Sequence, residues 1–170
     1  NDEKAVLQVD AFQVVNWGAN AVFTNSGEIN SKGGVTNDEG KFFNNGNIGV
    51  ENSTIGDPSR VGVVNQNGGV FENHASVRLR NIRFQGVRSV GGASFVNTGE
   101  IVMRDTIGWD GIYNDSYFDN SGSISIENTG LKDQTQGNGI VTSGVSGSYF
   151  RNSGIINLGS GIGRDGIRVE

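Results

Sequence analysis

The chain has 170 residues, enough for one domain, and its 18 acidic and 13 basic residues give a formal net charge of −5. This acidic balance disfavours a nucleic-acid partner, and the absence of cysteine excludes a disulfide framework and thiol chemistry. No apolar stretch reaches the roughly 20 residues of a transmembrane helix, so we expect no membrane span.

A short phrase, Phe-x-Asn-x-Gly-x-Ile, recurs six times and organises the whole sequence. Only the third copy departs from this pattern, with Ala75 in place of glycine and Val77 in place of isoleucine. A repeat of this kind, which tolerates uneven spacing between its copies, is typical of a solenoid. The six copies are Phe23–Ile29, Phe42–Ile48, Phe71–Val77, Phe95–Ile101, Phe118–Ile124 and Phe150–Ile156.

Each phrase continues with alternating apolar and polar residues, as in Ile101–Asp105 and Ile124–Asn128. A period of two predicts a β-strand whose apolar side chains point inward. A third element follows, in which a glycine precedes valine or isoleucine, and it completes the repeat. Its copies begin at Gly34, Gly62, Gly86, Gly111, Gly139 and Gly166.

Three short strands in each turn of roughly 20–30 residues are what a parallel β-helix requires. The predicted fold is therefore all-β: a right-handed parallel β-helix (solenoid) of about six coils, with three short strands per coil. The 28 glycines disfavour helix. We expect residues 1–170 to form a single β-helix domain. Because the chain begins at Asn1 rather than at methionine, we also expect it to be a segment of a longer secreted protein.

Two rows of asparagine are predicted to form ladders up the solenoid. Asparagine suits a corner of the coil, and its amide can bond to a copy of itself about 4.8 Å away in the next coil. We expect the glycine that follows the first row to permit a tight bend, and the six phenylalanines to stack inside as a column. The first row is Asn25, Asn44, Asn73, Asn97, Asn120 and Asn152, and the second is Asn52, Asn81, Asp105 and Asn128.

The ends of the chain show no capping element, and Asp165–Glu170 resembles the start of another coil. An uncapped coil leaves a row of unpaired N–H and C=O groups. The expected partners are therefore flanking domains of the same protein or other copies of the chain. Loops are predicted at Thr54–Arg60 and Thr129–Gly137, and neither carries a binding signature.

Several aspartates are candidates for acid–base chemistry, because enzymes with this fold that cleave acidic polysaccharides need clustered carboxylates. Asp110 and Asp165, however, both precede a Gly-Ile pair, and a residue that recurs at equivalent coil positions indicates a structural turn. The only histidine, His74, has no evident catalytic or metal-binding partner in the sequence. We therefore predict no enzymatic activity, no catalytic residue, no metal and no cofactor. The aspartates considered are Asp105, Asp110, Asp115 and Asp119.

An aromatic group is the predicted contact for a ligand or partner. Each tyrosine that directly precedes a core phenylalanine should point outward, where rings stack on sugars or bind proteins. The alternative is that a loop covers these rings or that they only shield the sheet. The group comprises Trp109, Tyr113, Tyr117 and Tyr149.

Four arginines lie between Val77 and Arg88. They are either a patch for sulfate, phosphate or acidic glycans, or an ordinary solvated strand face. We favour the second interpretation because they alternate with apolar residues, and we expect them to face Glu51 and Glu100 on neighbouring coils.

The phrases Phe95–Ile101 and Phe118–Ile124 resemble the Asn-Ser-Gly-x-Ile repeats of very large secreted bacterial surface proteins. The resemblance covers residues 5–170 and is closest to the β-helical repeat regions of Bacteroidota-type adhesins and appendage proteins. It implies an extracellular or cell-surface location and a structural or adhesive role in a fibre, appendage or adhesin, without catalysis. The alternative is a polysaccharide-binding or polysaccharide-degrading β-helix module with surface glycans as partners. Convergence of the aromatic group and the aspartates in one groove would favour that alternative.

Overall fold

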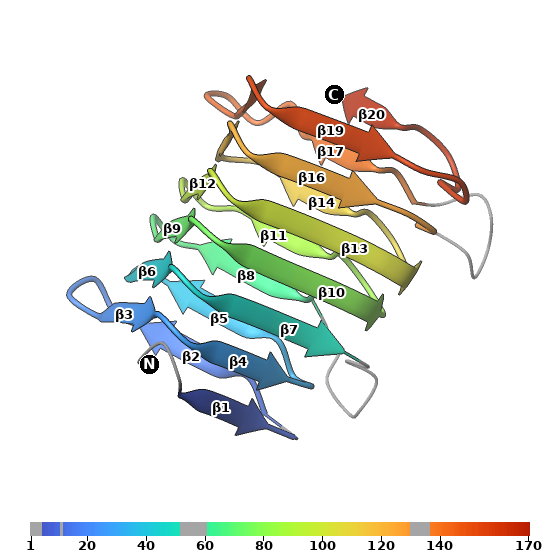
Figure 1. Ribbon diagram of the computed structural model, residues 1–170. Coiled ribbons are helices and arrows are strands. Elements are labelled where there is room, and N and C mark those ends of the chain that lie inside the picture. Colours follow the sequence, from blue (N-terminus) through green and yellow to red (C-terminus); the bar gives the residue numbers. More distant parts are fainter. Residues whose placement is uncertain (1–4, 11, 52–60, 130–136) are drawn as a thin grey trace.

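The computed structural model describes residues 5–10, 12–51, 61–129 and 137–170, and within them the chain forms strands and no helix (Figure 1). The loops predicted at Thr54–Arg60 and Thr129–Gly137 fall almost wholly outside these residues. The strands belong to three parallel sheets, which we name A, B and C.

Sheet A contains β1 (Val6–Val9), β4 (Glu28–Ser31), β7 (Asn47–Glu51), β10 (Ser76–Ile82), β13 (Glu100–Ile107), β16 (Ser123–Ile126) and β19 (Ile155–Leu158). Sheet B contains β2 (Val14–Trp17), β5 (Val35–Asp38), β8 (Val63–Gln66), β11 (Val87–Ser89), β14 (Ile112–Asn114), β17 (Ile140–Thr142) and β20 (Ile167–Val169). Sheet C contains β3 (Val22–Asn25), β6 (Lys41–Asn44), β9 (Val70–Asn73), β12 (Ser94–Asn97), β15 (Tyr117–Asn120) and β18 (Tyr149–Asn152).

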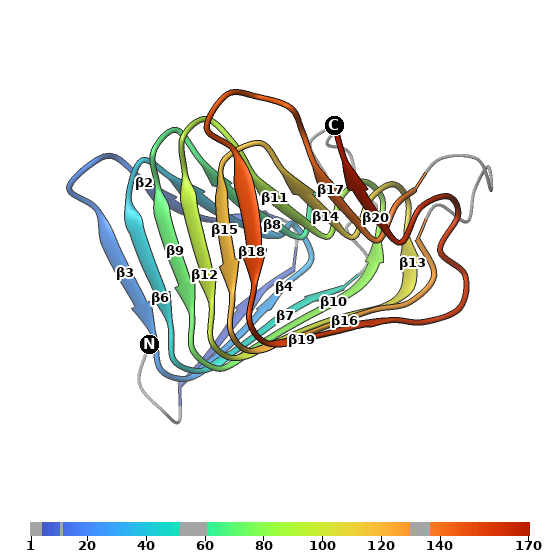
Figure 2. The ribbon, with the colours of Figure 1, turned by 90° about the horizontal axis from the view of Figure 1, so that it is seen from above.

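The chain visits the sheets in the order A, B, C, so each strand pairs in parallel with the strand three places later. Figure 2, seen from above with the C-terminal coil nearest, shows the three sheets enclosing one core and the chain winding anticlockwise as it rises. This is the predicted right-handed parallel β-helix. The coils number about seven rather than about six, because β1 and β2 precede the first Phe-x-Asn phrase.

A column of six phenylalanine rings fills the core beneath sheet C, as predicted. Successive ring centroids are 4.7–5.0 Å apart and the planes are tilted by 5–20°, so the rings stack at the spacing of the coils. The four central rings are fully buried, whereas Phe23 and Phe150, in the outer coils, are partly exposed. Apolar rows from sheets A and B complete the core, with Ile101 and Ile112 among their buried members.

The first predicted asparagine row is a continuous hydrogen-bonded ladder at the corner between sheets C and A. Each Nδ2 donates to the Oδ1 of the asparagine in the next coil at 2.6–2.7 Å. All of these side chains except Asn152 are buried. We call this row the long ladder: Asn25, Asn44, Asn73, Asn97, Asn120 and Asn152.

The second predicted ladder is wrong. Asn81, Asp105 and Asn128 share a left-handed backbone, with φ of 52°, 68° and 58°, and so mark a corner rather than a stack of buried amides. The Asp105 carboxylate is exposed and lies 3.6 Å from the Arg80 guanidinium. Asn52 lies outside the described residues.

A different row at the corner between sheets B and C forms a second ladder. Asn16 donates to Asn37 at 2.7 Å, and Asn37 donates to Asn65 at 2.8 Å. The strand register continues this row through Ser89, Asn114 and Thr142. We call Asn16, Asn37 and Asn65 the short ladder.

The glycines that follow the long ladder act through close approach rather than through a left-handed bend, which corrects the predicted reason for them. A Cβ on Gly122 would collide with the carbonyl oxygen of Gly99 in the coil below, and a Cβ on Gly99 would meet that of Ala75. Neither glycine has a positive φ. The absence of a side chain therefore lets successive corners stack.

Candidate functional site

Two exposed tyrosines lie side by side on the outer face of sheet C. Tyr117 begins β15 and Tyr149 begins β18, and the strand register places them opposite each other. Their ring centroids are 5.1 Å apart with the planes at 52°, and the residues are 42% and 44% exposed. This pair offers apolar ring surface to a sugar or to a partner protein.

The other two predicted aromatic residues lie elsewhere. Trp109, at the corner between β13 and β14, meets Phe84 edge-on at 5.4 Å. Tyr113 lies on β14, half-buried, between Arg88 and Val141 of the neighbouring strands. Among the four predicted residues, the structure thus shows a ring contact between Tyr117 and Tyr149, whereas the ring contact of Trp109 is with Phe84.

Asp110 and Asp165 lie in a polar row at the corner between sheets A and B. Oδ1 of Asp110 accepts hydrogen bonds from the backbone N–H of Asn138 at 3.0 Å and from its Nδ2 at 2.8 Å. Oδ1 of Asn138 in turn accepts the backbone N–H of Asp165 at 3.3 Å. The recurring residue before each Gly-Ile pair thus ties one corner to the next, as the sequence pattern indicated.

The other aspartates have separate partners. Asp119 binds Arg151 through two hydrogen bonds of 2.6 and 2.9 Å, and these raise the pKa of the arginine. Asp115 accepts the backbone N–H of Gly91 at 3.0 Å. The four aspartates considered as acid–base candidates therefore lie at separate positions, each with its own partner.

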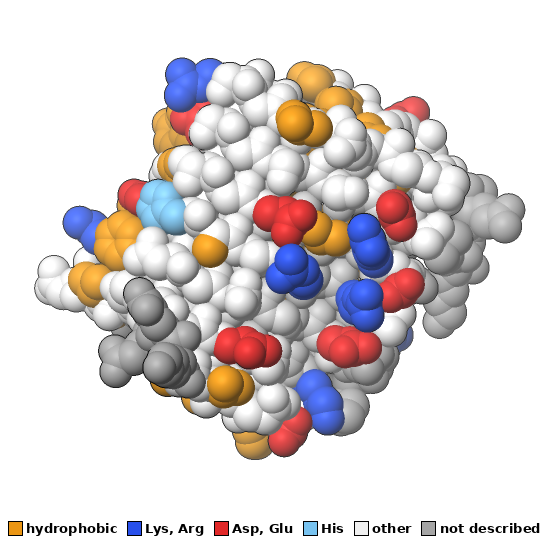
Figure 3. Space-filling view, in the orientation of Figure 1, with side chains coloured by type: hydrophobic (Ala, Val, Ile, Leu, Met, Phe, Trp, Pro, Cys, Tyr) orange, Lys and Arg blue, Asp and Glu red, His pale blue; other side chains and the backbone are white. Residues whose placement is uncertain are grey.

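The outer face of sheet A carries acidic and basic side chains intermixed over its central strands (Figure 3). Arg78 binds Glu100 at 3.1 Å, as expected. Arg80 lies beside Glu51 in the strand register, but its ion pair is with Asp105 at 3.6 Å. On the same face, Gln8 and Lys32 hold the pKa of Asp10 below its ordinary value by hydrogen bonding and opposite charge. These contacts are those of a solvated, ion-paired strand face.

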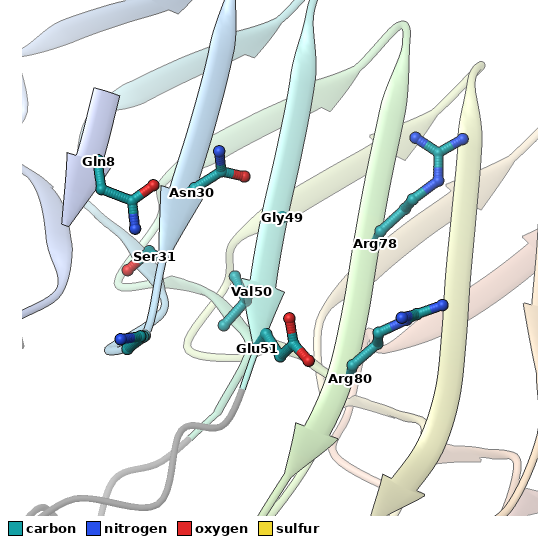
Figure 4. Close-up of a pocket in the computed structure, with 9 residues that line it drawn as sticks. Gln8, Asn30, Ser31, Gly49, Val50, Glu51, Arg78 and Arg80 are labelled. Carbon is teal, nitrogen blue, oxygen red and sulfur yellow. The ribbon is translucent and has the colours of Figure 1, made fainter. Parts of the chain in front are cut away.

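A shallow groove of about 390 Å³ crosses this face from β1 to β10, and its floor is Gly49, which has no side chain to fill the space. Arg78 and Arg80 rise from β10 at one side and lean away from Gly49 (Figure 4). Asn30 and Glu51 stand nearer the floor. The groove is open, its lining residues are mostly polar or charged, and none of the exposed aromatic residues lines it.

His74 has two side-chain partners that sequence reasoning did not find. Its Nε2 lies 3.0 Å from Oε2 of Glu72, and its Nδ1 lies 2.9 Å from Oγ1 of Thr98 in the next coil. All three side chains lie near the surface at the corner between sheets C and A. Once the coil register is known, the signal is visible in the sequence, because Thr98 occupies in the fourth phrase the position that His74 occupies in the third.

Within the described part of the chain, no group of three or more histidine, cysteine, aspartate or glutamate residues is arranged to hold a metal ion. Over the same residues, no helix is long and apolar enough to cross a membrane. Compared with known proteins, the chain matches no family model, no curated protein and no solved structure. Its class is therefore given by its own geometry, that of a parallel β-solenoid with three strands per coil.

Proposed function

We propose that this chain is an extracellular structural or adhesive segment of a bacterial surface fibre, appendage or adhesin. The repeated residues support this role, because nearly all of them point inward or form corners. They specify the coil itself and leave the outer faces variable, which suits a spacer or scaffold.

The observation that carries the proposal is this inward placement of the repeated residues. The outermost coils also differ from the coils inside the stack. Ile167 is 53% exposed, whereas Ile140, its in-register neighbour one coil below, is fully buried. At the other end Leu7 is 37% exposed and its neighbour Ile29 is fully buried. The C-terminal end face thus presents core-row side chains and strand edges that another copy of the chain can cover.

The long ladder gives these end faces a direction. Each of its asparagines from Asn25 to Asn120 donates its Nδ2 to the asparagine of the next coil toward the C-terminus. The last member, Asn152, turns its Nδ2 to the carbonyl oxygen of Gly154 at 3.1 Å. A coil added at the C-terminal face in the same orientation would continue all the rows, whether it came from a longer chain or from another copy.

Light scattering at increasing protein concentration tests the end contact. We expect the mass to rise above the 18.0 kDa of one chain. Val169→Lys, which places a charge on the C-terminal end face, should suppress that rise. Ile155→Lys is the matched control, because Ile155 is also an exposed residue of the last coil but points sideways from sheet A. A mass of 18.0 kDa at every concentration would exclude stacking between copies, and the flanking sequence of the parent gene would then decide whether further coils exist.

The Tyr117–Tyr149 pair favours a second candidate function, binding of surface glycans. Stacking of a sugar on both rings would make each tyrosine important, so Tyr117→Ala and Tyr149→Ala should each weaken polysaccharide binding about tenfold or more in calorimetric titration. Tyr113→Ala, on the neighbouring sheet, is the control. Equal binding by all the variants would contradict this candidate.

A further inference from the structure

Glu72, His74 and Thr98 form a hydrogen-bonded chain of carboxylate, imidazole and hydroxyl at the surface. The Glu72–His74 distance is 3.0 Å and the His74–Thr98 distance is 2.9 Å, both within hydrogen-bonding reach. The side chains of His74 and Glu72 are 39% and 33% exposed, and Thr98 is an exposed residue. A nucleophile, a base and a group that orients the base are therefore adjacent and accessible to solvent.

The carboxylate determines which nitrogen of the neutral imidazole carries the proton. An ionised glutamate only accepts hydrogen bonds, so the Nε2 of His74 must be the donor in that contact. The Nδ1 then has a free electron pair directed at Thr98, and the hydroxyl donates to it. The carbonyl oxygen of Asn73, at 3.3 Å, is a second and longer acceptor for the same hydroxyl proton. When the ring is protonated, Nδ1–H becomes a donor, and this carbonyl is the acceptor left to the hydroxyl.

We propose that Thr98 is a nucleophilic acyl acceptor, with His74 as its general base and Glu72 as a positioning residue, and that its substrates are activated acyl esters. Oγ1 of Thr98 attacks the ester carbonyl carbon while its proton passes to Nδ1 of His74. The carbon–oxygen bond to the leaving alcohol then breaks, and the alkoxide takes that proton. The products are an ester on Thr98 and a free alcohol, with no change in oxidation state.

The backbone of this corner limits the reaction to slow, single acylation. The N–H groups of Thr98 and Gly99 both donate to the carbonyl oxygen of Asn73, at 2.9 and 3.0 Å. They are thus engaged and not directed at a developing oxyanion, and removal of a single oxyanion-hole donor costs a serine protease about 10²–10³ in rate. We therefore expect a stable modified threonine rather than rapid turnover.

The test is incubation of the intact chain with p-nitrophenyl acetate, followed by peptide mass spectrometry and by measurement of nitrophenolate. The chain contains a matched internal control in Ser121, which follows ladder residue Asn120 as Thr98 follows Asn97 and donates its backbone N–H in the same way. We expect acetylation at Thr98 at least tenfold faster than at Ser121. Equal rates at the two hydroxyls would overturn the proposal.

Three variants assign the roles. His74→Gln should reduce acetylation of Thr98 at least tenfold, because general-base catalysis contributes about 10²–10⁴ in rate. Glu72→Gln, which keeps the shape but removes the charge, should lower the rate with no change in melting temperature. Thr98→Ser should retain the reaction. An unchanged rate in His74→Gln, or loss of reaction only in variants that also melt earlier, would refute the assignment.

Discussion

The long and short ladders are built from the same residue at the same kind of position, yet only the long one runs through every coil of its sheet. In the long ladder, two residues separate the strand of sheet C from the next strand of sheet A in every coil, as in Thr98-Gly99 and Ser121-Gly122. In the short ladder, the turn that follows has different lengths: Asn37 bonds the carbonyl oxygen of Gly40, three residues on, and Asn65 bonds that of Gly69, four residues on.

The comparison shows that the length of the corner does not decide whether a side-chain ladder continues. Asn16, Asn37 and Asn65 are bonded to one another although the turns that follow them differ in length. The turns after Asn65 and Ser89 are equal in length, and the ladder stops between them. The residue at the row position decides it, because a serine side chain has no amide and is too short to span two coils. The short ladder ends at Asn65, because the next position of the row is Ser89, whose hydroxyl is fully buried and has no hydrogen-bond partner. Asn114, in the next coil, bonds the backbone of its own turn and of the coil above instead.

The largest expected effect is on the column beside the long ladder. Phe95→Ala should lower the free energy of unfolding by about 3–5 kcal/mol, because it opens a cavity between two stacked, fully buried rings. Denaturant melts measure this. A loss no larger than that of the ladder variant below would show that the ladder, and not the ring column, dominates this corner.

Breaking the long ladder at its centre should cost less. Asn97→Ala removes the acceptor for Asn73 and the donor to Asn120, so we expect a loss of about 1–3 kcal/mol in the free energy of unfolding. Chemical denaturation of this variant beside Asn65→Ala sharpens the comparison, since Asn65 is an end member with one asparagine partner. A larger loss for Asn65→Ala would contradict the view that continuity strengthens the ladder.

Extending the short ladder should stabilise the protein. Ser89→Asn supplies a carboxamide between Asn65 and Asn114 and replaces an unpartnered buried hydroxyl, so we expect a gain of about 1 kcal/mol and a higher melting temperature. Ser89→Ala, which only removes the hydroxyl, separates the two contributions. If the asparagine variant melts below the alanine variant, the corner at Ser89 has no room for an asparagine side chain.

The smallest effect is expected outside both ladders. Arg80→Ala on the outer face of sheet A should change the free energy of unfolding by no more than about 0.5 kcal/mol, because exposed ion pairs contribute little. Thermal melts at low and high salt would measure it. A loss comparable with that of Asn97→Ala would mean that the outer charges contribute as much as the interior rows.

The regularity of each row explains how much of the structure could be predicted from the sequence. The phenylalanine column and the long ladder were predictable because each recurs within one phrase of constant spacing. The short ladder was missed because its signal, in which Asn37 and Asn65 come two residues after a buried valine, is followed by turns of unequal length. The erroneous row through Asn81 satisfied the sequence pattern, but its positive φ turns the chain at the position where an inward side chain would be needed.

The candidate site was less predictable than the fold. The pairing of Tyr117 with Tyr149 follows from their equal distance to a core phenylalanine, so the register alone places them together. The contact of His74 with Thr98 depends on which side chains stand above each other in successive coils. It also depends on the rotamers of the two side chains, which a sequence motif within a single coil does not specify.

The uneven lengths of the coils determine how this protein would respond to a pulling force along its axis. Each coil is held only by its neighbours, so axial tension would peel coils from an end one at a time rather than break the whole domain at once. The coil from Phe95 to Phe118 spans 23 residues and would release about 80 Å of chain, whereas the next, from Phe118 to Phe150, spans 32 residues and would release about 110 Å. A single molecule stretched in this way would lengthen in a series of unequal steps whose order reports the end from which it unravels.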